Sequence, residues 1–295
     1  MKGIYRAISL ARICRLLGVT RQAYYQHFWH LSDLTVEQQL VLNWVGEIRQ
    51  IHPVIGGRKL FYLLQPFLFE HQIKMGRDAL FDLLAENKLL VRKRRRRINT
   101  TQSHHWLKKY PNLIKDWHPS KPNQLWVSDI TYIPLINGFL YLSLITDAYS
   151  HKILGYSVAN NLEATHTIKA LKMALKDLTQ KPGRLIHHSD RGVQYCSFDY
   201  VNLLKENNIE ISMTENGDPL ENAVAERVNG IVKGEYLEHY SLNNQGQVDE
   251  LIIDIINRYN TLRPHQSIRM KTPEIVHEKQ LLINKTWSKK KQYLT

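Results

Sequence analysis

The stretch LWVSDITYIPLINGFLYLSLITDAYSHKILGYSV, residues 125–158, decides the fold of this 295-residue chain. It holds three apolar runs rich in β-branched and aromatic residues, at 125–133, 139–146 and 152–158. Such runs are typical of strands, and the segments between them are short and carry turn residues such as Gly138. Three strands at this spacing predict an antiparallel meander.

Helices and strands alternate after the meander. The expected elements are, in order, a helix at 163–178, a strand at 184–188, a helix at 198–206, a strand at 209–213 and a long helix from about Pro219. The order β-β-β-α-β-α-β-α is that of the ribonuclease-H-like fold, an α/β architecture with a mixed five-stranded sheet and flanking helices. No internal repeat interrupts it.

Three acids fall at informative points of this order. Asp129 lies in the first strand, Asp190 just beyond the fourth, and Glu226 on the helix after the fifth, with 35 residues between the last two. The first and fourth strands of a mixed sheet can be neighbours. Asp129 and Asp190 are therefore expected to converge at one edge of the sheet, where Glu226 would close the site.

Each acid taken singly has an ordinary interpretation, because an Asp at a strand end usually caps a turn and a Glu on a helix is usually solvated. Four other acids are interpreted in that way, as exposed residues outside the site: Asp147, Asp199, Asp218 and Glu221. Asp147 is the closest rival to the set because it also ends an apolar strand.

Carboxylates at all three positions favour magnesium. Mg²⁺ is a hard cation that prefers carboxylate oxygens, and two such ions about 4 Å apart activate the attacking oxygen of a phosphodiester reaction and stabilise the leaving one. Imidazole or thiolate would suit zinc instead. Asp129, Asp190 and Glu226 are thus predicted to be catalytic and to bind two Mg²⁺ ions, for which Mn²⁺ is a substitute.

The helix around Glu226 carries further polar residues on the same face. Asn222 lies four residues before it, Asn229 three after and Lys233 seven after. All three are predicted to contact DNA, with Lys233 holding a phosphate. A solvated helix face remains the alternative.

The composition is that of a globular protein, 43% hydrophobic and 23% charged. No run approaches roughly 18 apolar residues and no signal-peptide pattern is present, so neither a membrane span nor secretion is expected. Cys14 and Cys196 belong to no Cys-x-x-Cys pattern, which argues against a disulfide framework and a zinc finger. We expect a cytoplasmic location.

The net charge of +13 is concentrated at the N-terminal end. Residues 1–118 contain 20 Lys and Arg against 8 Asp and Glu, whereas residues 119–295 contain 20 against 19. This asymmetry indicates a polyanionic partner better than a need for solubility does.

Helices are expected throughout this basic region. Amphipathic helices at about 8–17 and 21–27 have helix-turn-helix spacing, in which Arg21 and Gln22 would contact DNA, although a hairpin that only packs its own leucines is an equal alternative. Further helices are expected between 36 and 91, where Arg77 near a helix start would also reach DNA.

A run of six cations follows: Arg92, Lys93, Arg94, Arg95, Arg96 and Arg97. It is interpreted both as a solvated linker and as a DNA-binding segment that orders on phosphates. The predicted divisions of the chain are a helix-turn-helix-like segment at 1–45, a second helical DNA-binding unit at 46–98, a linker at 99–121, the catalytic core at 122–280 and a basic tail at 281–295.

Four ordered motifs resemble the transposases of bacterial insertion sequences in the IS-three family, whose core is similar to retroviral integrase. They are the strand around Asp129, HSDRGVQY at 188–195, the segment from SMT at 212–214 to NAVAER at 222–227, and YNTLRPHQ at 259–266. The helical N-terminal region resembles the family more loosely, through ICRLLGV at 13–19 and GGRK at 56–59.

The resemblance implies that Asp129, Asp190 and Glu226 form the metal-binding triad and that Lys233 contacts the element's end. Water would cleave the transposon end, and the freed 3′-hydroxyl would attack target DNA without a covalent protein intermediate or ATP. The implied partners are inverted-repeat end DNA and target DNA, with a homo-oligomer holding the two ends. Where the family often has YDNA, this chain has LENA at 220–223, and it lacks the cysteines of the retroviral zinc-binding domain.

Family members often fuse two reading frames, the first of which supplies a helix-turn-helix and a leucine zipper. This chain has no sustained heptad run, so it is interpreted as a second-frame product with an upstream-frame partner. Two alternatives to a transposase are a nuclease with the same core and a non-enzymatic DNA-binding regulator. The helix bearing Glu226 and the following Arg-Pro-His segment disfavour the nuclease, and the acid triad disfavours the regulator.

Overall fold

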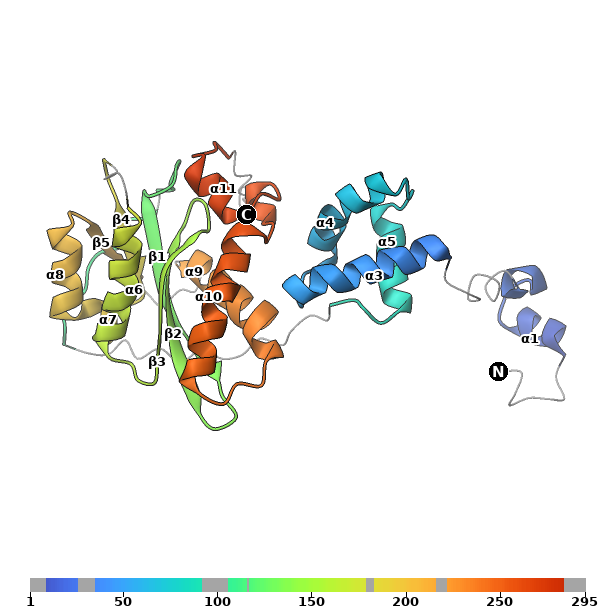
Figure 1. Ribbon diagram of the computed structural model, residues 1–295, viewed down its shortest axis with the longest axis horizontal. Helices are drawn as coiled ribbons and strands as arrows, with labels where there is room; N and C mark the ends of the chain where they lie inside the picture. Colours follow the sequence, from blue (N-terminus) through green and yellow to red (C-terminus); the bar gives the residue numbers. More distant parts are fainter. Residues whose placement is uncertain are drawn as a thin grey trace, which may run out of the picture.

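The computed structural model describes residues 9–25, 35–91, 106–115, 117–178, 183–215 and 222–283. Its larger part is an α/β core, and a smaller helical unit precedes the core in sequence (Figure 1). In the described ranges, no helix is both long and apolar enough to cross a membrane.

The core is built on one mixed sheet of five strands. These are β1 (Leu125–Pro134), β2 (Phe139–Asp147), β3 (Ile153–Ala159), β4 (Ile186–Ser189) and β5 (Glu210–Met213), in the spatial order β3-β2-β1-β4-β5. The first three form the antiparallel meander, and β4 and β5 add in parallel on the other side of β1. The predicted ribonuclease-H-like fold is therefore confirmed, including the neighbouring first and fourth strands.

Helices cover both faces of the sheet (Figure 1). The helices α6 (Ala164–Lys176), α7 (Val193–Cys196) and α8 (Phe198–Glu206) pack on one face, and α9 (Ala223–Ile231) and α10 (Gln245–Thr261) pack on the other. The side chains of β1 alternate between the two faces of the sheet, so that Trp126 packs against the first group of helices and Ile133 against the second. Gly155 of β3 lets α6 approach closely, because a Cβ there would collide with the carbonyl oxygen of Ala170.

The long helix expected from Pro219 differs from the observed one. The helix α9 begins at Ala223 and passes at Val232 into a π-helical turn, η2 (Val232–Tyr236), and then into a 3-10 turn, η3 (Leu237–His239). The apolar residues of this segment continue at helical spacing, so the sequence did not reveal the wider π-helical turn. The core closes with η4 (Gln266–Ile268) and α11 (Pro273–Glu278).

The helical unit consists of α3 (Val36–Ile51), α4 (Gly57–Glu70) and α5 (Arg77–Glu86). A common apolar cluster, centred on Leu60, Leu64 and Leu80, joins the three helices. The boundary drawn at residue 45 falls inside α3, so the packed unit begins at the N-cap of that helix. The predicted helix-turn-helix region contains α1 (Leu10–Leu16) and a helical segment at 21–25.

Part of the predicted linker packs against the core. The backbone N–H of Met213 donates to the carbonyl of Pro111 at 3.3 Å, and the N–H of Leu113 donates to Ser212 Oγ at 2.9 Å. Ile283, in the predicted tail, is buried beside Tyr149, whose hydroxyl accepts its N–H at 2.7 Å. The described ends of both segments therefore belong to the core.

Candidate active site

The sheet register places Asp129 and Asp190 side by side. The parallel strands β1 and β4 pair at Val127 and His188, and each aspartate lies two residues beyond its member of that pair. Asp129 lies on β1 and Asp190 directly follows β4, and the two are close enough for the charge of Asp190 to raise the pKa of Asp129. The sequence predicted this convergence from strand order alone.

Asp129 is held by two hydrogen bonds. Asn229 Nδ2 donates to its Oδ2 at 2.8 Å, and the backbone N–H of Ile130 donates to its Oδ1 at 2.9 Å. Burial raises the pKa of Asp129 to about 7, the charges of Asp190 and, less strongly, Glu226 act in the same direction, and the two hydrogen bonds oppose them. The three acids therefore share one electrostatic environment.

Two asparagines attach the helix of Glu226 to β1. Asn222, the N-cap of α9, donates from Nδ2 to the carbonyl of Ser128 at 2.9 Å, and Asn229 donates to Asp129. Glu226 lies between them in the first turn of α9. Both amides are buried, and their hydrogen bonds to β1 identify them as groups that position the helix. The DNA contacts predicted for them remain a prediction.

Asp190 begins a tight turn after β4. The N–H of Gly192 donates to its Oδ1 at 3.0 Å, and this bond orients the carboxylate. A Cβ at residue 192 would lie 3.0 Å from the same oxygen, closer than ordinary contacts allow, so glycine suits the turn. The short helix α7, which the sequence did not predict, starts directly after it.

The donor set suits a hard divalent cation in its chemistry. All three acids offer carboxylate oxygens, and Oδ1 of Asn222 and Oδ1 of Asn229 are buried without a hydrogen-bond partner among the described residues. Buried acceptors without donors are costly, and a cation or an ordered water nearby relieves that cost.

The carboxylates do not yet form a closed ligand set. Across the described ranges, no group of three or more His, Cys, Asp or Glu side chains is arranged to hold a metal ion. Carboxylates that lie close together repel one another, which is consistent with this spacing in the absence of a cation.

A buried polar network lies on the other side of β1. His187 Nε2 is 2.8 Å from Ser128 Oγ and 2.9 Å from the hydroxyl of Tyr200. Burial, together with the neighbouring His188, lowers the pKa of His187 to about 3, so the ring is neutral. This network was not predicted from the sequence, although two histidines inside a buried strand were a signal of it.

The residues predicted to bind DNA lie apart from one another. Lys233 is half-buried on η2, beyond Glu226, while Arg21 and Gln22 are exposed at the start of the helical segment at 21–25. Arg77 is exposed and forms an ion pair with Asp78 at 2.8 Å. The six cations at 92–97 lie outside the described residues.

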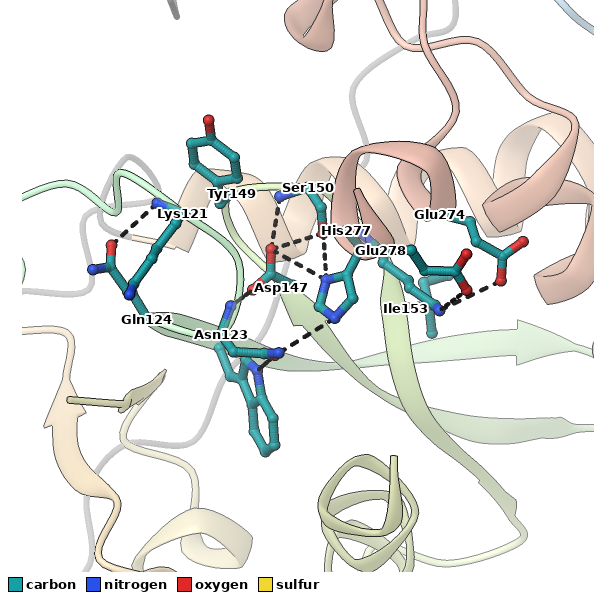
Figure 2. Close-up of polar contacts among 12 residues, drawn as sticks. Lys121, Asn123, Gln124, Asp147, Tyr149, Ser150, Ile153, Glu274, His277 and Glu278 are labelled. Carbon is teal, nitrogen blue, oxygen red and sulfur yellow. Dashed lines mark hydrogen bonds and ion pairs between the residues drawn. The ribbon is translucent and has the colours of Figure 1, made fainter. Parts of the chain in front are cut away.

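Asp147, interpreted from the sequence as an exposed acid, is fully buried, and Figure 2 shows its polar contacts. Its Oδ2 accepts the N–H of Asn123 at 2.7 Å, and its Oδ1 accepts both the N–H and the hydroxyl of Ser150 at 2.7 Å. His277 of α11 lies beside it, with Nδ1 3.9 Å from Oδ1. The interpretation was wrong because α11, far along the chain, covers the strand end.

Comparisons with known proteins agree with this architecture. Two models, each described as an integrase core domain, match residues 119–219 and 207–273. An uncharacterized 31 kDa protein of insertion element IS600 from Shigella sonnei is 35% identical, over 90% of this chain and 98% of its own length.

Two further relatives are named transposases. The transposase of insertion sequence IS629 from Shigella sonnei is 30% identical, over 85% of each chain. Transposase InsF of insertion sequence IS3A from Escherichia coli K12 is 28% identical, over 92% of this chain and 95% of its own. The chain belongs to the IS-three family of insertion-sequence transposases, whose core is an integrase domain.

Proposed function

We propose that this protein catalyses DNA transposition, in which it cuts the ends of its element and joins them to target DNA. The single observation that carries the proposal is the register of β1 and β4, which places Asp129 beside Asp190. The helix of Glu226, bound to β1 through two amides, lies over that pair. Named transposases of similar length support the assignment.

The cofactor in this proposal is magnesium, two ions per site, with Mn²⁺ as a substitute. Asp129, Asp190 and Glu226 would hold the ions. When bound, they would supply the Lewis acidity that phosphodiester cleavage and joining require. The chain's own part is to orient Asp129 through Asn229, whose hydrogen bond favours the ionised carboxylate against the burial that raises its pKa to about 7.

The proposed partners are the inverted-repeat ends of the element and target DNA. The excess of cations in residues 1–118 and the run at 92–97 would bring the polyanion to a core that is nearly neutral. Because two ends must be joined together, the active species would be a homo-oligomer.

A strand-transfer assay tests the function. Precleaved end oligonucleotide, supercoiled target DNA and MgCl₂ are incubated with the full chain, with Asp190→Asn as the control. Joined products from the wild type and none from the variant support the proposal. Hydrolysis without joining would identify a nuclease of the same fold, and a mobility shift without chemistry would identify a DNA-binding regulator.

Dependence on an upstream-frame protein with a helix-turn-helix and a leucine zipper is a separate part of the proposal. It predicts weak binding of the purified chain to its terminal repeats. Tight, sequence-specific binding by this chain alone would contradict it.

A further inference from the structure

The helical unit contacts the core at the π-helical turn η2, directly after the helix that bears Glu226. His52, at the C-cap of α3, is buried, and its Nδ1 lies 2.7 Å from the hydroxyl of Tyr236. Tyr236 is the last residue of η2 and belongs to the largest apolar cluster of the core. A side chain of the helical unit therefore enters the interior of the catalytic domain.

A charged contact lies next to this hydrogen bond. Arg263, which is fully buried, donates from Nε and Nη2 to the two carboxylate oxygens of Glu235, each at 2.7 Å. Lys59 of α4 approaches the same carboxylate at 4.0 Å. Consecutive residues of η2, Glu235 and Tyr236, are thus both bound by the helical unit.

A third contact fixes the orientation of α3. Arg258 of α10 donates from Nη1 to the carbonyls of Gln50 at 3.0 Å and Ile51 at 3.3 Å. These are the last carbonyls of α3, where a cation is favourable both as a hydrogen-bond donor and as a charge. The end of α3 and the start of α4 are therefore held against the core on both sides of the turn at 52–56.

The π-helical geometry of η2 must be maintained by the contacts around it. π-helical turns are rare, cost conformational energy and occur often at functional sites, so the surrounding contacts must maintain them. Lys233 lies on η2 itself, and Glu226 lies two turns earlier on the same continuous helix. A change in η2 would rotate or shift both residues.

We propose that His52 and Lys59 are positioning residues for the carboxylate site: through Tyr236 and Glu235 they hold η2, and so couple the helical unit to the placement of Glu226 and Lys233. The inference rests on the proposed function for its catalytic consequence and on geometry alone for the coupling. Burial lowers the pKa of His52 to about 4, so the ring is neutral and its bond to Tyr236 persists at physiological pH.

The test removes a single hydroxyl group in the full chain. Tyr236→Phe deletes the partner of His52 and keeps the ring, and Tyr259→Phe is the matched control. Tyr259 is equally buried in the same cluster, and its hydroxyl has no hydrogen-bond partner among the described residues. Both variants are compared for amide hydrogen exchange at 223–236, for end-DNA affinity and for joining rate at saturating DNA.

Tyr236→Phe is expected to speed exchange at 223–236 and to slow joining by about tenfold each, with unchanged DNA affinity, while Tyr259→Phe changes neither. Equal behaviour of the two variants would overturn the inference. If the wild type joins no DNA, the proposed function fails, while the exchange comparison still decides the coupling. Should Tyr236→Phe not fold, Lys59→Met is measured in the same way, and unchanged exchange in that variant contradicts the proposal.

Discussion

Asp129 and Asp147 lie on adjacent strands of one sheet, yet their surroundings are opposite. Asp147 receives three hydrogen bonds from its own turn and from Asn123, and His277 lies beside it (Figure 2). Burial alone would raise the pKa of Asp147, but the neighbouring His277 and the hydrogen bonds from Ser150 outweigh it, so the pKa is lowered. Asp129 faces two other acids, and its pKa is raised to about 7.

The difference separates a structural acid from a proposed catalytic one. A buried carboxylate surrounded by donors is stable as it stands and contributes to folding. A carboxylate that faces others is costly unless a cation joins them, which is expected of a site that binds metal and substrate.

Asp129→Asn should give the largest effect. Removing this carboxylate should lower the joining rate by about 1000-fold or more, because a proposed metal ligand is lost. The free energy of unfolding should stay within about 1 kcal/mol of wild type or rise, because repulsion is relieved. The joining assay and urea denaturation measure the two quantities, and a joining rate above a tenth of wild type would refute the role of Asp129.

Asp147→Ala should show the reverse pattern. The change leaves the buried N–H groups of Asn123 and Ser150 without acceptors, so we expect the free energy of unfolding to fall by about 3 kcal/mol. Joining per folded molecule should be unchanged. Asp147→Asn, which retains one acceptor oxygen, is the control and should lose less stability. Equal stability of both variants and the wild type would show that the hydrogen bonds to Asp147 drawn in Figure 2 do not stabilise the fold.

The two aspartates should also differ in how pH affects their roles, and Asp129 should make magnesium binding depend on pH. The folded pKa of Asp129, about 7, lies above the ordinary aspartate value, so the metal-free fold binds this proton more tightly than the unfolded chain does. Protonated Asp129 therefore stabilises the metal-free fold at low pH, and this contribution to stability is lost as the pH rises through 7. In the proposed site magnesium would compete with the same proton, so its apparent affinity should rise about tenfold per pH unit below 7 and level off above it.

Calorimetric titration with MgCl₂ between pH 5.5 and pH 8.5, about the range over which a group with this pKa titrates, measures that slope. Asp147→Asn should keep the wild-type profile, because Asp147 is not in the site. A flat profile in the wild type would mean that Asp129 does not bind the ion.

The smallest effect is expected from Asn229→Leu. Losing its bond to Asp129 should weaken magnesium affinity by about tenfold, as loss of a group that orients a metal ligand typically does. Joining at saturating magnesium should largely recover. Asn243→Leu, an exposed asparagine outside the site, is the control, and an equal loss of affinity in both variants would contradict the role of Asn229.

The elements that the sequence predicted correctly are those with local periodicity. The strands of the meander, α8 and the meeting of Asp129 with Asp190 follow from apolar alternation and strand order. The exposure of Asp147 was mispredicted because it depends on His277, 130 residues later. The π-helical turn is contacted by His52 and Arg263, which no local pattern connects to it.

The packing of residues 106–115 along the core should decide which shorter fragments of the chain aggregate. β5 ends the sheet, and its exposed edge would be a template for pairing with other chains. Pro111 and Leu113 lie against that edge, at Met213 and Ser212. A fragment cut at residue 119, where the integrase match begins, would uncover β5 and should aggregate, whereas one that starts at residue 106 should stay monodisperse.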